Sequence, residues 1–73
     1  MAHKIIYDAL IKKYTADIAD ASTKITILMT NTRIIPEHID VTGEIDKLLG
    51  KIEEAESRMA ILQRVYGKNE AIN

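Results

Sequence analysis

The sequence predicts an all-α protein: an antiparallel two-helix hairpin, coiled-coil-like, that assembles into a helical bundle. Three observations support this prediction. Two long segments contain no proline and show no alternation of period two, which excludes strands. Each segment repeats apolar residues every seven positions. A short segment holding Pro36 separates them. We therefore expect residues 1–73 to form a single helical-hairpin domain.

The first expected helix covers about residues 3–30 and contains neither Gly nor Pro. Its apolar residues follow alternating steps of three and four, which places them on one stripe of a helix and defines the seam of a coiled coil. The seam residues of this helix are Tyr7, Ile11, Tyr14, Ile18, Ala21, Ile25 and Leu28.

The connecting loop covers about residues 31–40. Pro36 disfavours the α conformation in the residue before it and so marks the break between the helices. The carboxylate of Asp40 can accept hydrogen bonds from the first backbone N–H groups of the next helix. Asp40 is therefore the expected N-cap, and Thr42 is the alternative.

The second expected helix covers about residues 41–66, and residues 67–73 form a tail. Gly67 fits the position just past the helix end, in the left-handed conformation. Gly50 lies inside the helix, where glycine costs about 1 kcal/mol relative to alanine; it is either a plain surface cost or a point of close helix approach. The seam residues of this helix are Val41, Ile45, Leu48, Ile52, Ala55, Met59, Leu62 and Tyr66.

The two seams fit one antiparallel register, in which facing residue numbers sum to 73. In this register both small seam residues face an isoleucine: Ala21 faces Ile52, and Ala55 faces Ile18. Alternation of small and large residues fills a core without voids, which favours this register.

Charged residues flank the expected seam. The register places Asp17 near Arg58, a favourable pair, and Lys24 near Lys51, an unfavourable one. Exposed pairs of this kind contribute little to stability, so they do not decide the register.

Several aliphatic side chains remain outside the seam at the open end of the hairpin, away from the loop. Two helices bury only a thin core, and soluble monomers seldom expose apolar patches, so both arguments predict association into a homo-oligomer such as a four-helix bundle. The predicted oligomer or partner interface consists of Ile5, Ile6, Leu10, Ile61 and Val65.

The loop is the second candidate contact surface. The alternative is that its isoleucines fold back over the tip of the hairpin. The candidate contact residues in the loop are Arg33, Ile34, Ile35, Glu37 and His38.

The residues predict no enzyme, no cofactor and no metal. The chain has no Cys, and His38 lacks the spacing of a helical zinc motif, so a solvated loop histidine is the favoured interpretation. The carboxylates of Glu53, Glu54 and Glu56 fall on an outer helix face, where they are expected to be solvated rather than to perform acid–base catalysis. The three tyrosines are expected to pack on the seam rather than to line a pocket.

The charges argue against a general nucleic-acid binder, because ten basic residues are interleaved with eleven acidic ones. No apolar run approaches the roughly 20 residues of a membrane span, and the N-terminus lacks a signal-peptide core. We therefore expect a soluble protein of the cytoplasm or of a virion, with no membrane partner.

Two stretches of the chain resemble a sequence pattern found in other small helical proteins. The first is Tyr-Asp-Ala-Leu-Ile-Lys-Lys-Tyr at residues 7–14. The second consists of Asn31, Glu37, His38, Asp40, residues 44–48 (Glu-Ile-Asp-Lys-Leu), Lys51, Ile52, Ala55 and Glu56. Together they resemble a pattern in small helical proteins of tailed bacteriophages, especially T4-like phages of cyanobacteria and other marine bacteria. In the loop, this chain has residues 33–36 (Arg-Ile-Ile-Pro) and Ile39 where those proteins have a Gly-rich stretch and a Pro.

The resemblance implies a phage origin and no established activity. With the helical pattern, it leads us to expect a non-enzymatic protein–protein interaction module: a small phage-encoded structural or accessory protein that acts as an oligomer. One alternative is a small phage regulator that binds and inhibits a host enzyme, in the cytoplasm of the host cell. A further alternative is an accessory protein that binds nucleic acid.

Overall fold

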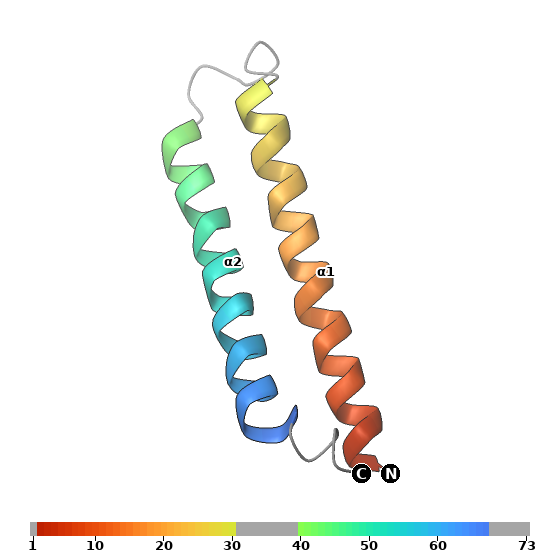
Figure 1. Ribbon diagram of the computed structural model, residues 1–73. Helices are drawn as coiled ribbons and strands as arrows, with labels where there is room; N and C mark the ends of the chain where they lie inside the picture. Colours follow the sequence, from red (N-terminus) through yellow and green to blue (C-terminus); the bar gives the residue numbers. More distant parts are fainter. Residues whose placement is uncertain (1, 31–39, 68–73) are drawn as a thin grey trace.

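The computed structural model describes residues 2–30 and 40–67. They form two α-helices, α1 (Ala2–Thr30) and α2 (Val41–Leu62), and α2 continues into a π-helical turn, η2 (Gln63–Gly67). The two helices pack side by side and antiparallel, so the start of α1 and the end of α2 lie at the same end of a rod (Figure 1). The rod measures 54 × 15 × 15 Å. The predicted antiparallel hairpin is confirmed.

Helix α1 accommodates its threonines by local hydrogen bonds. The hydroxyl of Thr15 donates to the carbonyl oxygen of Ile11 over 2.8 Å, and that of Thr26 donates to the carbonyl oxygen of Ser22 over 3.0 Å. These bonds satisfy hydroxyl groups that would otherwise compete for the helix backbone. With neither Gly nor Pro in its interior, α1 runs unbroken along the whole rod.

Helix α2 begins at the N-cap that the sequence predicts. The Asp40 side chain accepts a hydrogen bond from the backbone N–H of Gly43 over 3.0 Å, and the Asp40 carbonyl accepts one from the N–H of Glu44 over 2.9 Å. The Glu44 carboxylate lies in the first turn, where the helix dipole favours negative charge. A Cβ atom at Gly43 would take the place of the Asp40 carboxylate, so a larger residue there requires that side chain to shift.

The end of the second helix corrects two expectations. We expected Gly67 in the left-handed conformation, but no described residue has a positive φ. We expected Tyr66 on the seam, but it is 47% exposed. In η2 each backbone bond reaches five residues instead of four, so the positions after Leu62 fall behind the heptad by about one residue. Half-buried Gly67 therefore takes the place beside Tyr7 that the register gave to Tyr66.

The core of the hairpin is a narrow stripe between the helices. Of residues 3–30 and 40–67, the buried ones are Ala21, Leu48 and Ala55. All other predicted seam positions except Tyr66 are half-buried, which confirms the seam. The Thr15 hydroxyl oxygen lies 3.9 Å from the Met59 sulfur, in agreement with the predicted register.

Gly50 is a surface position rather than a point of close approach. A Cβ atom built on it would meet no other atom within 4 Å. Its cost to α2 is therefore a plain loss of helix propensity. Neither of the two helices described is both long and apolar enough to cross a membrane.

Candidate interaction surface

The predicted interface residues lie where α1 begins and the second helix ends. Leu10 is half-buried against the hairpin, whereas the other four are exposed aliphatic side chains. They are Ile5, Ile6, Ile61 and Val65. The loop candidates Arg33, Ile34, Ile35, Glu37 and His38 lie outside the described residues.

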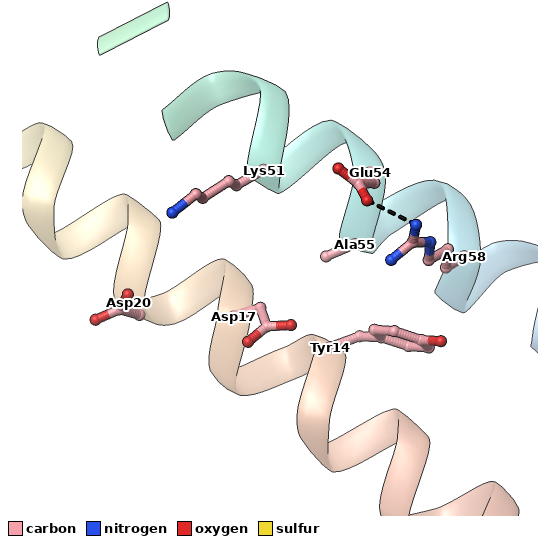
Figure 2. A pocket seen from close by; sticks show the side chains of 7 residues that line it. All are labelled: Tyr14, Asp17, Asp20, Lys51, Glu54, Ala55 and Arg58. Atoms are coloured by element: carbon pink, nitrogen blue, oxygen red, sulfur yellow. Dashed lines mark ion pairs between the residues drawn. The ribbon is translucent and has the colours of Figure 1, made fainter. Parts of the chain in front are cut away.

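One flank of the hairpin is hollowed between the helices near its middle. Figure 2 shows that the side chains around this hollow come from both helices, with Asp17 reaching from α1 toward α2 and Lys51 reaching from α2 toward α1. Buried Ala55 lies at its base, where a small side chain leaves room between the helices. The lining residues are Tyr14, Asp17, Asp20, Lys51, Glu54, Ala55 and Arg58.

The ion pairs around this hollow run along the helices rather than across it. Arg58 Nη2 lies 2.6 Å from Glu54 Oε1 on α2, and Lys13 Nζ lies 3.1 Å from Asp17 Oδ2 on α1. Asp17 and Arg58 do line the same hollow, as the register predicts, but each pairs with a neighbour one turn away. Their side chains are about half-exposed, so these pairs add little stability and remain accessible to a partner.

A second hollow continues along the flank toward the loop end and is more apolar. Lys51 lines both hollows, which makes them two parts of one groove. Lys24 also lines the second hollow, so the unfavourable neighbourhood of Lys24 and Lys51 predicted from the sequence is present. Lys24 pairs with Asp20 at 3.1 Å, whereas Lys51 makes no ion pair with any residue that the structure describes. The residues lining the second hollow are Lys24, Ile27, Leu28, Glu44, Leu48 and Lys51.

Four of the aliphatic residues at the open end lie on the same side of the hairpin as the groove. The reason is that residues seven positions apart lie on one line along a helix in a coiled coil. Leu10 is seven residues before Asp17, and Val65 is seven after Arg58. Ile6 is fourteen residues before Asp20, and Ile61 is seven residues after Glu54, so each lies on the same line as a groove residue. We call this face, from the four aliphatics through the groove, the groove flank. Its residues are Ile6, Leu10, Asp17, Asp20, Lys24, Ile27, Glu44, Lys51, Glu54, Arg58, Ile61 and Val65.

The opposite flank of the hairpin has fewer apolar side chains. Ile5 lies one position before Ile6 and therefore about 100° away around α1, on that opposite flank. Met29 and Leu49 are exposed there near the loop end. The predicted interface residues thus divide between the flanks, with four on one and Ile5 on the other.

The described side chains present no constellation for metal binding. Nowhere in residues 2–30 and 40–67 do three or more His, Asp or Glu residues gather closely enough to hold an ion. The lining of the two hollows consists of aliphatic, acidic and basic side chains and one tyrosine, and it includes no Ser, Thr, Cys or His.

Comparison of the chain with models of known protein families, with curated proteins and with solved structures finds no match. The resemblance to bacteriophage proteins therefore stays a prediction.

Proposed function

We propose that this protein is a non-enzymatic protein–protein interaction module that acts as an oligomer of hairpins. One observation carries the proposal: several aliphatic side chains are exposed to solvent on a hairpin whose buried core is only a narrow stripe. The exposed aliphatics at the open end are Ile5, Ile6, Ile61 and Val65, with half-buried Leu10 between them.

The free energy of folding supports association. Ordering a residue costs about 1–2 kcal/mol of conformational entropy, and burial returns about 25 cal/mol per Å² of apolar surface. Two helices have only one shared face, so most seam side chains of the single hairpin remain half-exposed. A second set of helices would cover these side chains and the open-end aliphatics together, and this added burial favours the oligomer.

The cellular role that we propose is that of a small phage-encoded structural or accessory protein, in the virion or in the cytoplasm of the host cell. The resemblance at residues 7–14 and in the second helix supports this role. A regulator that binds a host enzyme would use the same apolar surface. Nucleic-acid binding is disfavoured because Lys13, Lys24 and Arg58 are each paired with a carboxylate on their own helix.

Sedimentation equilibrium of the pure protein at about 100 µM tests the proposal, because obligate oligomers reveal themselves by a concentration-dependent mass. We expect a mass above that of one chain. Ile61→Gln should shift the protein toward the monomer, since it places a polar group in the apolar contact. Leu49→Gln is the matched control: Leu49 and Ile61 lie on the same helix and are both 51% exposed. A monomeric wild-type protein, or an equal effect of both substitutions, would contradict the proposal.

A further inference from the structure

We infer that the groove flank is the face on which a second copy of this chain packs, with the two-fold axis parallel to the helices, so that α1 of each copy lies on α2 of the other. This inference rests on the proposed oligomer and specifies its interface. The product is a four-helix bundle in which every helix is antiparallel to both of its neighbours.

The size of the flank suits a stable dimer. A face 54 Å long and 15 Å wide has an area of about 800 Å², which is about what each partner buries in an interface of standard size. The groove extends along much of this face, and aliphatic side chains occupy both of its ends. The flank therefore offers enough surface, and enough apolar surface, for a second hairpin.

The charges across the groove select the direction of the axis. On the first hollow α1 contributes Asp17 and Asp20, a net charge of −2, whereas α2 contributes Lys51, Glu54 and Arg58, a net charge of +1. A two-fold axis parallel to the rod keeps every residue at its own height. The α1 helix of one copy then lies on α2 of the other with the same residues opposite, so Asp17 meets the partner's Arg58 and the net negative side of the hollow meets the net positive side. Lys51 then lies opposite a stretch of the partner's α1 that holds both Asp20 and Lys24, so its charge alone does not decide between the axes.

The alternative two-fold axis, perpendicular to the rod, opposes like charges. It would lay α1 antiparallel on α1 of the other copy and α2 on α2. With the axis midway between residues 17 and 20 of α1, Asp17 would face Asp20 of the partner subunit, and Lys51 would face Arg58 of the partner subunit. Like charges placed opposite each other in an interface cost several kcal/mol, so this arrangement is disfavoured.

The parallel axis also places the aliphatic ends together. Ile6, Leu10, Ile61 and Val65 of both copies meet at the open end of the bundle, where they form one apolar cluster. At the other end, the apolar hollow around Ile27 meets the same hollow of the second copy. The ends of the bundle thus supply the burial, and the charged middle sets the direction and alignment of the copies.

A spin-label distance separates the two arrangements. The chain has no Cys, so Met29→Cys introduces a single attachment site; Met29 is 62% exposed, close to the loop end of α1, and lies on the opposite flank. With the axis parallel to the rod, both labels lie at the same end, less than about 35 Å apart across the bundle. With the perpendicular axis they lie at opposite ends, about 40 Å or more apart at 1.5 Å of rise per residue. A distance above about 35 Å in the dimer overturns the inference.

Charge reversal tests whether the groove flank is the interface. Asp17→Arg and Arg58→Asp should each weaken the homodimer by about tenfold or more, because each places like charges opposite one another twice. An equimolar mixture of the two variants should restore the wild-type affinity, since both pairs in the heterodimer are then opposite in sign. Repulsion within one hairpin would be the same in the mixture, so only a contact between copies predicts this rescue.

The outcomes distinguish this inference from the function on which it rests. A wild-type monomer in sedimentation overturns both. A dimer that shows no rescue in the mixture, or a long label distance, overturns only the inference and leaves the interaction module standing. The control substitution Lys12→Glu, at an exposed position seven residues from Ala19 and Ile5 on the opposite flank, should leave the dimer affinity within about twofold.

Discussion

Tyr7 lies against Gly67 across the open end of the hairpin: a Cβ atom on Gly67 would lie 3.2 Å from the Tyr7 hydroxyl oxygen. Such a distance is tighter than an ordinary van der Waals contact, so the side chain at position 67 is limited by the ring opposite. The contact exists because η2 winds more widely than an α-helix and brings Gly67 round to the seam in place of Tyr66.

A double-mutant cycle should detect this contact. Alanine at a helical glycine usually gains up to about 1 kcal/mol, but in Gly67→Ala the Tyr7 hydroxyl offsets the gain. In the Tyr7→Phe background the hydroxyl is absent, so the same change should stabilise the protein, with a coupling of about 0.5 kcal/mol between the two sites. Urea unfolding of the four proteins measures it. Tyr14→Phe, about 10 Å farther along α1, is the control and should be additive with Gly67→Ala.

The two other glycines of the second helix should respond differently to alanine. Gly50→Ala should raise the free energy of unfolding by about 0.8–1 kcal/mol, because the added methyl group enters open space and only the helix propensity changes. Gly43→Ala should gain less than Gly50→Ala, since the new Cβ forces the Asp40 carboxylate to shift and weakens a cap that is worth about 0.5–2 kcal/mol. Thermal melting by circular dichroism compares them. An equal rise in Tm for both variants would contradict this account of the cap.

The fold was predictable because local signals and the apolar pattern agree. Pro36 and Asp40 mark the break, and the seven-residue repeat assigns the seam that burial then confirms. Tyr66 was assigned wrongly because a heptad assumes uniform winding. No residue type in this stretch signals the π-helical turn, which shifts the positions after Leu62.

The interaction surface was predictable only in part. Aliphatic residues left off the seam identify the open end, because helical geometry alone shows that the hairpin does not need them. The groove was missed, since its charged pairs were judged one at a time and each exposed pair has little weight. The signal was present in the spacing: Leu10, Asp17 and Lys24 are seven residues apart, so one line joins an apolar end to a charged middle.

Two adjacent leucines should separate the core from the surface. Leu48 is buried and Leu49 is 51% exposed, although they are neighbours on α2. Leu48→Ala should lower the free energy of unfolding by about 2–3 kcal/mol, because it removes apolar contacts and leaves a cavity. Leu49→Ala should cost less than about 1 kcal/mol. Urea unfolding at one fixed protein concentration measures both, so that any assembly contributes equally. Similar losses would place the seam elsewhere.

Ala21, only 1% exposed, is the position at which added volume should be least tolerated. Ala21→Leu should destabilise the hairpin by about 1–3 kcal/mol, because the larger side chain overpacks the core. Ala21→Gly should cost about 1 kcal/mol, because glycine has a lower helix propensity. The register places Ile52 opposite, so combining Ala21→Leu with Ile52→Ala exchanges a small and a large residue across the seam and keeps the core volume. The double variant should therefore be at least about 1 kcal/mol more stable than the sum of the single effects predicts. Urea unfolding of the single and double variants measures this coupling, and exposed Ala19→Leu serves as the control. Strict additivity would show that residues 21 and 52 do not face each other.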